Sequence, residues 1–409
     1  MIKLIQVFIC IFLTMSLSGC WNLRESNMVD YALAVGIDMN ERGEVVITVQ
    51  SPVLEALKPQ TTSSGEDKSK SLSVSGKTTF EAVREYVKIM GVKVFWSHLK
   101  IILISEKAAK NGVQEYFEFF FTDPELRNTA LVAVVKGRAK DILETKPDIT
   151  SMSAKLLHNQ FKYSPIEAEA PSVSFNEFTY NLSHPKGGQP YLPIIKMYEQ
   201  KDYDEEKVGI KSYQGKDSKQ SNLFFVEGTA VFRETKMIGT LNKRETRGLL
   251  WVTNEMKSAV VRVPCMDENK DCYVTLEVSG KIHRKANVSY DGDIPIIKIN
   301  IKTNLDIADL TNQFKVIDQR YLSYLEEQFA ATVRSEIEAS FKKTAMDWKV
   351  DIFSFGNTLD DRHPRVWSAI EDKWSRQILP EAKLDITVNA KIRRRGRILY
   401  SPWVKTEED

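Results

Sequence analysis

Residues 321–341 read YLSYLEEQFAATVRSEIEASF, and this stretch decides the fold class of the C-terminal half. Its apolar side chains recur every three or four residues, at Leu322, Leu325, Phe329, Val333, Ile337 and Phe341. That spacing places them on one face of an α-helix, and the helical period runs from about residue 317 to residue 347. Such a face either packs on a sheet or lies on a membrane. We favour a long helix whose apolar face packs on a sheet.

Strand patterns surround this helix on both sides. Before it, runs rich in β-branched and aromatic residues occur at 223–232, 237–241, 249–252, 260–263, 273–278 and 294–303. Asp291-Gly292-Asp293 predicts a hairpin turn, because the ligand spacing of a calcium loop is absent. After it, a helix is expected over 366–378, and 384–392 is apolar at every second residue, as in a strand. The C-terminal half therefore reads as a sheet packed with helices.

The N-terminal half alternates between the two periods. Strands are expected at 31–38, 44–50, 99–104 and 129–135, with helices at 78–89 and 107–121. On the first helix, Phe80, Val83 and Val87 form the predicted buried face, with Tyr86 as a further candidate. The whole chain is thus predicted to be α+β, with mixed or antiparallel sheets packed with helices and a long helix in the C-terminal region.

Composition and polarity indicate the domain boundaries. We expect a signal peptide at 1–19, an N-terminal domain of one or two subdomains at 20–200, a linker at 201–222, a C-terminal domain at 223–397 and a tail at 398–409. The linker is charged, polar and contains glycine. Residues 58–76 are rich in Ser, Thr and Lys and predict a flexible surface loop.

The overall charge excludes some functions. The 409 residues contain 57 Lys and Arg against 55 Asp and Glu, a formal net charge of +2, with 42% apolar residues. A protein that coats nucleic acid needs a large excess of basic residues, so no nucleic-acid partner is expected. The apolar content excludes a disordered chain and a protein with many membrane spans.

The first twenty residues predict export and a lipid anchor. Lys3 precedes an apolar run from Leu4 to Leu17, which is too short for a transmembrane helix and typical of a signal peptide. The run ends in Leu17-Ser18-Gly19-Cys20, which resembles a bacterial lipobox, with Cys20 as the acylated residue. The alternative is an ordinary secretory signal that happens to end in a cysteine.

Two further cysteines remain in the mature chain, Cys265 and Cys272. In an exported protein this pair can close a disulfide around a small polar loop, or remain as two free thiols. No histidine or other cysteine lies at ligand spacing from the pair, so no metal site is expected.

Motifs for catalysis are weak throughout. The five histidines are scattered, and no metal-binding pair or nucleophile elbow occurs. Gly76-Lys77-Thr78 lacks the first glycine of a phosphate-binding loop, and Asp360-Asp361-Arg362-His363 is interpreted as a loop before a helix. The basic run at 391–397 can either meet anionic lipid headgroups or form the solvated end of a strand, and we favour the strand end. We therefore expect no catalytic residues, no cofactor and no enzymatic activity.

Several short motifs nevertheless occur in a familiar order. They are Gly19 to Glu25, Gly36-Ile37-Asp38, Glu227 to Phe232 with Met237 to Leu241, Asp351 to Gly356, Pro364 to Trp367, Trp374, and Lys391 to Gly396. Together they resemble the Ger(x)C family, the lipoprotein C subunits of spore nutrient germinant receptors. The resemblance covers nearly the whole mature chain and is clearest at its two ends.

The resemblance implies a non-enzymatic subunit of a receptor complex. Members are anchored by lipid to the outer face of the inner spore membrane and assemble with two membrane subunits. Only Cys20, as the acylated residue, carries over as a functional position. Whether a small molecule binds this subunit directly stays open, and a lipid-anchored solute-binding protein that captures the germinant is the alternative function.

Overall fold

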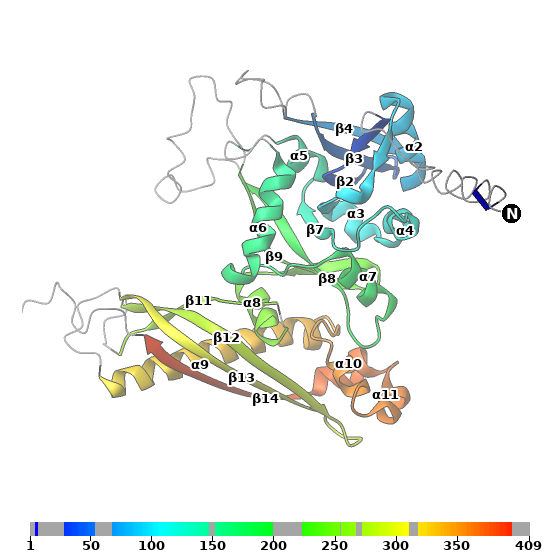
Figure 1. The fold of residues 1–409 in the computed structure, drawn as a ribbon. Helices are drawn as coiled ribbons and strands as arrows, with labels where there is room; N and C mark the ends of the chain where they lie inside the picture. Colours follow the sequence, from blue (N-terminus) through cyan, green and yellow to red (C-terminus); the bar gives the residue numbers. More distant parts are fainter. Residues whose placement is uncertain are drawn as a thin grey trace, which may run out of the picture.

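The chain forms two lobes, one above the other in Figure 1. The computed structural model describes residues 5–6, 28–53, 68–145, 147, 152–198, 223–253, 255–266, 272–310 and 318–394. We call the part up to residue 241 the first lobe and the part from residue 243 onward the second lobe. Cys20 and the expected linker at 201–222 lie outside the described residues.

An eight-stranded sheet forms the centre of the first lobe, in the order β10-β9-β8-β7-β6-β2-β3-β4. Its four middle strands, β8, β7, β6 and β2, are parallel, and the outer strands pair antiparallel. The strands are β2 (Ala34–Met39), β3 (Val45–Pro52), β4 (Ser69–Gly76), β6 (Ile101–Ser105), β7 (Leu131–Lys136), β8 (Tyr191–Tyr198), β9 (Leu223–Arg233) and β10 (Lys236–Leu241). A separate parallel ribbon pairs β1 (Val29–Tyr31) with β5 (Lys93–Phe95).

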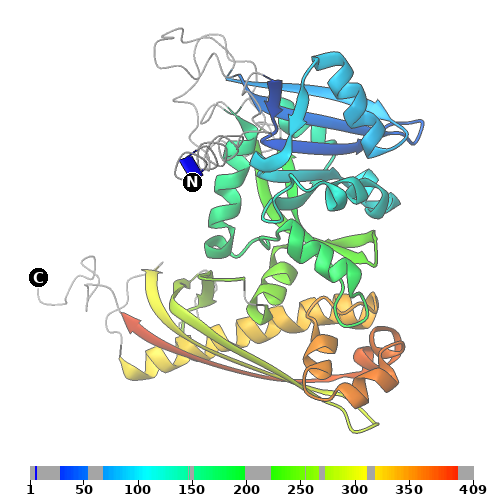
Figure 2. The ribbon, with the colours of Figure 1, turned by 45° about the vertical axis from the view of Figure 1, so that its right-hand side comes forward.

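Helices cover both faces of this sheet, as Figures 1 and 2 show. One face packs against α2 (Thr79–Met90), α3 (Glu106–Asn111), α4 (Gln114–Thr122) and α7 (Phe175–Ser183). The other face packs against α5 (Ala139–Glu144) and α6 (Ser153–Glu167). Because middle strands are covered on both sides, they need continuous apolar sequence, and all five residues of β6 are buried.

The second lobe is a four-stranded sheet with one helical face. Its order is β11 (Val260–Pro264), β12 (Tyr273–Ser289), β13 (Ile296–Leu310) and β14 (Lys383–Arg394). The long helix α9 (Gln319–Phe341) continues as the π-helix η6 (Lys342–Asp347), and all six residues of its predicted apolar stripe are buried. The predicted core helix is therefore confirmed, as is the mixed α and β fold.

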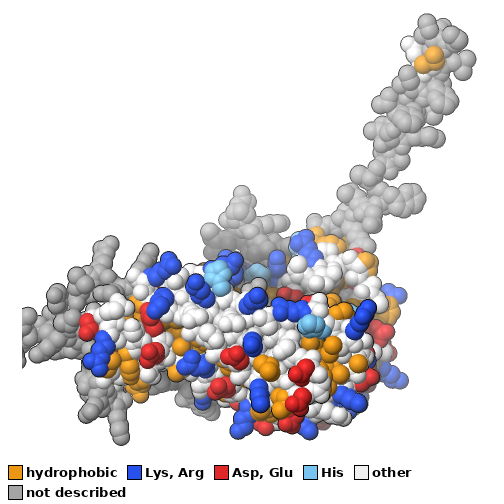
Figure 3. Space-filling model, turned by 90° about the horizontal axis from the view of Figure 1, so that it is seen from below, with side chains coloured by type: hydrophobic (Ala, Val, Ile, Leu, Met, Phe, Trp, Pro, Cys, Tyr) orange, Lys and Arg blue, Asp and Glu red, His pale blue; other side chains and the backbone are white. Residues whose placement is uncertain are grey.

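The remaining elements are short. The second lobe also contains α8 (Lys243–Val252), α10 (Phe355–Asp360), α11 (Pro364–Ile370), η7 (Trp374–Ile378) and η8 (Leu379–Glu381), and the first lobe contains η3 (Trp96–His98). Figure 3 views the molecule from the end formed by the second lobe, where Lys and Arg side chains alternate with Asp and Glu. Lys281, His283 and Lys285 of β12 are exposed.

Three predictions of local structure were wrong. Residues 249–252 belong to helix α8, because Asn242 and Glu245 form a capping box that starts a helix at Lys243. Residues 69–76, expected in a loop, form strand β4 because they pair antiparallel with β3 along its whole length. On α2 the buried face consists of Ala82, Val83 and Tyr86, whereas Phe80 is 56% exposed.

Two predicted helices are interrupted, and two strands pair outside the C-terminal sheet. The helix expected over 107–121 divides into α3 and α4 around Gly112, whose φ is 130°. The helix expected over 366–378 divides into α11 and η7. Strands β9 and β10, which we expected to open the C-terminal domain, belong to the first sheet because β9 pairs with β8.

The close approach of α8 to α9 yields a prediction. A Cβ at Gly248 would lie 2.0 Å from the backbone oxygen of Glu336, so Gly248→Ala forces the two helices apart. We expect a loss of about 2–3 kcal/mol in the free energy of unfolding, measured by urea denaturation. A gain of about 1 kcal/mol, as helix propensity alone would give, contradicts this packing.

Candidate functional site at the junction of the two lobes

A loop of the first lobe docks onto the second lobe without space for side chains. A Cβ at Gly187 would lie 1.7 Å from Asn357 Oδ1, and one at Gly188 would lie 2.4 Å from Ser354 Oγ. The Asn357 N–H donates to the Gly187 carbonyl over 3.0 Å, and the Gln189 N–H donates to the Asp351 carbonyl over 2.6 Å. The two glycines are therefore needed for a close approach of two backbones.

The carboxylate of Asp351 organises the segment that receives this loop. It is fully buried and accepts the backbone N–H groups of Phe353, Phe355 and Gly356 over 3.1, 3.2 and 2.8 Å. It also accepts the indole N–H of Trp374 over 2.8 Å. Burial raises the pKa of Asp351, and these four hydrogen bonds oppose that rise. The arrangement gives a buried acid four donors and so makes it tolerable in the core.

Two tryptophans complete the receiving segment. The rings of Trp367 and Trp374 meet edge to face with centroids 5.9 Å apart. A Cβ at Gly356 would lie 2.6 Å from the Trp367 ring and 2.9 Å from Gly187 Cα, so only glycine fits. Asp351, Gly356, Trp367 and Trp374 all lie in the C-terminal motifs that carry the resemblance. The structure assigns them to the junction of the lobes.

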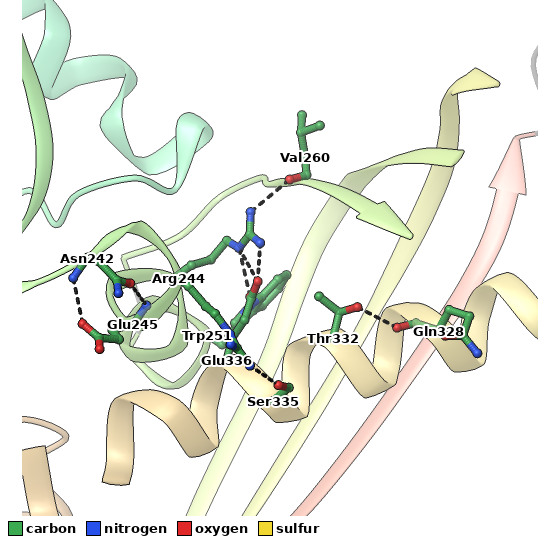
Figure 4. Close-up of polar contacts among 10 residues, drawn as sticks. Asn242, Arg244, Glu245, Trp251, Val260, Gln328, Thr332, Ser335 and Glu336 are labelled. Atoms are coloured by element: carbon green, nitrogen blue, oxygen red, sulfur yellow. Dashed lines mark hydrogen bonds and ion pairs between the residues drawn. The ribbon is translucent and has the colours of Figure 1, made fainter. Parts of the chain in front are cut away.

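A second buried charge holds α8 against α9, and Figure 4 shows its surroundings. The Glu336 carboxylate, 2% exposed, accepts Arg247 Nε over 3.0 and 2.9 Å and the Trp251 indole N–H over 2.8 Å. The Arg247 guanidinium also donates to the Val260 carbonyl over 3.2 Å. Sequence reasoning missed this cluster, although a glutamate next to Ile337 inside an apolar helical stripe was a usable signal.

A third buried acid, Glu255, forms hydrogen bonds between the two lobes. Glu255 of the second lobe accepts the Tyr191 hydroxyl over 2.5 Å and the Ser172 N–H over 3.0 Å, and both donors belong to the first lobe. Burial raises the pKa of Glu255 to about 7, which the two hydrogen bonds only partly offset. Burial likewise lowers the pKa of the neighbouring Arg284 to about 10. Sequence reasoning gave no signal for this contact, because its members are far apart in the chain.

The N-terminal motif has a structural role in the first lobe. Asp38 of Gly36-Ile37-Asp38 accepts the N–H groups of Ala139 and Lys140 over 2.8 and 2.9 Å, which anchors the start of α5. A Cβ at Gly36 would lie 3.0 Å from the Ala139 Cβ, so this glycine allows α5 to pack closely on β2. Burial raises the pKa of Asp38.

A pocket of about 340 Å³ lies beside the junction, at the carboxyl ends of β7 and β8. Its charged lining includes Lys136 and Lys196 of the first lobe and Lys343 of the second. Lys196 pairs with Glu227 at 2.7 Å, and Lys343 pairs with Glu245 at 2.7 Å. Space outside the carboxyl ends of parallel strands is a common ligand position in α/β folds, so the pocket bears on the solute-binding alternative.

The other candidate residues lie apart from the junction pocket. Cys265 and Cys272 form a disulfide that joins the facing ends of β11 and β12, and the Tyr324 hydroxyl donates to the Cys265 carbonyl over 3.0 Å. Among the described residues, no group of three or more His, Cys, Asp and Glu side chains is arranged to hold a metal ion. Gly76 packs against α2, since a Cβ there would lie 2.5 Å from the Ala82 nitrogen. That contact explains the glycine without a phosphate.

The remaining polar motifs are on the surface. Asp360, Asp361, Arg362 and His363 are exposed. Asp360 ends α10, and the other three lie between α10 and α11, in the predicted loop. Residues 291–293 lie at the β12–β13 hairpin turn, with Gly292 at a φ of 108°. In the basic run, Arg393 is exposed at the end of β14 and residues 395–397 lie outside the described part of the chain.

Comparison with known proteins identifies the class. Residues 22–197 match the spore germination protein N-terminal domain, and residues 227–396 match the C-terminal domain described as spore germination B3/GerAC like. The crystal structure of the GerBC protein superimposes with a TM-score of 0.55 at 19% identity, covering 88% of this chain and 96% of that one. The fold is therefore that of GerBC.

Relatives of similar length share this class. Spore germination protein KC of Bacillus subtilis is 24% identical over 387 residues, covering 93% of each chain. Spore germination protein B3 of the same organism is 23% identical over 395 residues, covering 95% of this chain and 96% of its own. The chain belongs to the GerAC family of spore germination proteins, the non-enzymatic C subunits of germination receptors. Among the described residues, no helix has the length and apolar character to span a membrane.

The buried acid Glu255 predicts how stability depends on pH. Its pKa is 4.5 in an unfolded chain and about 7 here, so between these values the folded state binds the extra proton. Stability should therefore fall by about 2–3 kcal/mol as the pH rises from 4.5 to above 7.

Urea unfolding at pH 5 and pH 8 tests this dependence. Glu255→Gln should reduce it, because the amide cannot ionise. The exposed Glu277→Gln serves as the matched control and should leave it unchanged. An equal pH slope in the Glu255→Gln protein would show that another group is responsible.

Proposed function

We propose that this protein is the lipid-anchored C subunit of a nutrient germinant receptor. In this proposal residues 1–19 are removed, Cys20 is acylated, and the chain stands on the outer face of the inner spore membrane. It assembles there with two membrane subunits and is required for nutrient-triggered germination through protein–protein contacts. The observation that carries the proposal is the lipobox at Leu17 to Cys20, directly before a chain that belongs to the C-subunit family.

The arrangement of the junction supports a role in contact rather than chemistry. The acids in the recognised motifs already have hydrogen-bond partners within the protein. Asp351 accepts four N–H donors, and Asp38 accepts two backbone N–H groups. Residues held this way fix the shape of the two lobes. A fixed shape, tethered close to a membrane, raises the effective concentration of its surfaces for membrane-embedded partners.

The second candidate function is direct capture of a germinant in the pocket beside the junction. Its volume of about 340 Å³ suits a small solute, and Lys136 lines it. Calorimetry of the mature chain with amino acids and sugars at millimolar concentration tests this function. Heat that disappears in a Lys136→Ala variant would favour capture by this subunit, and no heat would leave the contact role alone.

Removal of the anchor is the direct test of the proposal. Two acyl chains hold a protein on a bilayer stably, so Cys20→Ala should move the protein from the spore membrane fraction to the soluble fraction. The same spores should lose the response to one set of nutrients. We expect at least about a tenfold drop in membrane-bound protein by immunoblot, because two acyl chains contribute far more than the roughly 1.4 kcal/mol that a tenfold change requires.

A matched cysteine variant separates anchoring from folding. Cys265→Ser with Cys272→Ser removes the disulfide but keeps the lipobox, so this protein should remain in the membrane fraction. The proposed anchor would be contradicted if the Cys20→Ala protein stays in the membrane fraction and the spores that carry it germinate normally.

A further inference from the structure

One surface of the first lobe carries half-buried apolar side chains where β1 begins. In the β1–β5 ribbon, Val29 pairs with Lys93 and Tyr31 pairs with Phe95. The intervening pair, Asp30 and Val94, is buried. Since side chains alternate along a strand, the other four point outward together. The rings of Tyr31 and Phe95 meet edge to face, 5.6 Å between centroids.

Two strongly exposed apolar residues lie close to the ribbon in the chain, and α2, which carries one of them, packs against β5. Met28, directly before β1, is 62% exposed, and Ile89, in the last turn of α2, is 58% exposed. They are the two most exposed large apolar side chains among the described residues. We call Met28, Val29, Tyr31, Ile89 and Phe95 the ribbon face. Exposed apolar groups gathered in this way mark a contact surface.

The underside of the ribbon is held firmly. The buried Asp30 carboxylate accepts the Tyr86 hydroxyl of α2 and, over 2.7 Å, the Ser51 hydroxyl of β3. Lys70 of β4 lies 3.2 Å from the same carboxylate. Because these contacts of Asp30 hold the ribbon in place, its apolar groups cannot turn inward and stay available to a partner.

Charges around the ribbon face are balanced. Lys88 pairs with Glu85 at 3.0 Å, and Lys93 pairs with Glu125 at 3.3 Å. The partner is therefore selected by apolar and aromatic contact rather than by charge. Tyrosine and aliphatic side chains with nearby lysines are typical of groups that enter the headgroup level of a bilayer.

The short distance between the ribbon face and the proposed anchor at Cys20 indicates a membrane as its partner. Cys20 and Met28 are eight residues apart, so their Cα atoms are separated by at most about 29 Å, whatever path the chain takes. The second sheet, whose strand β12 exposes Lys281 and Lys285, belongs to the other lobe, below the first lobe in Figure 1. We propose that the ribbon face rests in the headgroup layer of the membrane that holds the lipid anchor. This inference depends on the proposed acylation of Cys20.

Labelling at a single cysteine tests this orientation. In the mature acylated chain Cys265 and Cys272 are bonded, so an introduced cysteine is the only free thiol expected. A fluorophore is attached at Ile89→Cys, and as matched control at Ile294→Cys, an exposed isoleucine at the β12–β13 hairpin. Each full-length lipoprotein is reconstituted in phosphatidylcholine vesicles that contain a headgroup-labelled quencher lipid, with and without phosphatidylglycerol.

The inference predicts at least about threefold stronger lipid quenching at position 89 than at position 294, with or without phosphatidylglycerol. Aqueous iodide should show the reverse order. Equal lipid quenching at the two positions overturns the inference, and so does a label at 89 shielded from both quenchers, which would indicate a protein partner. Mass measurement of Cys20 and flotation with vesicles separate the two claims. If Cys20 is not acylated, both the anchor and the membrane contact of the ribbon face are refuted. If the protein is acylated and bound to vesicles but the label at position 89 is not quenched, only the membrane contact of the ribbon face is refuted.

Discussion

The buried carboxylate of Asp351 is the interaction on which the arrangement of the two lobes depends. It gathers three backbone N–H groups and one indole N–H, and so fixes a turn whose surface fits two glycines of the first lobe. Left without these donors, a buried acid would cost several kcal/mol. The same turn positions Gly356 against Trp367. One acid therefore determines both the local fold and the docking between lobes.

The motifs that carry the family resemblance have structural roles in this chain. The solved relative GerBC shares the fold at only 19% identity. In the present chain, the motif residues Asp38, Asp351, Gly356, Trp367 and Trp374 all pack or bond inside the molecule. In the proposed function, the surfaces that this framework holds in place make the contacts. The proposed lipid anchor, the ribbon face and the junction pocket all lie outside this internal framework.

Sequence predicted the parts of the fold whose signal is local. The stripe on α9 and the alternation in β14 are periodic over many residues, so both elements were found. The strand predicted at 249–252 was wrong because the apolar run Leu249 to Val252 resembles a strand, while the capping box that decides for a helix lies seven residues earlier. Phe80 was assigned to the core because it lies three residues before Val83, but the buried face of α2 is centred on Ala82, Val83 and Tyr86. The partners of Glu336 and Glu255 could not be predicted, since they lie on segments that only the tertiary fold brings together, although an acid inside the apolar stripe of α9 signals that Glu336 needs a partner.

Hydrogen exchange at the junction tests the central claim most directly. If Asp351 holds the lobes as one unit, the amide of Gly356 and the indole N–H of Trp374 open only when the whole protein unfolds. Their protection in the mature protein should then equal that of the core strand β6, within about threefold. Exchange of these two groups orders of magnitude faster than β6 would show that the junction opens locally, and it would contradict the account of a rigid two-lobed framework.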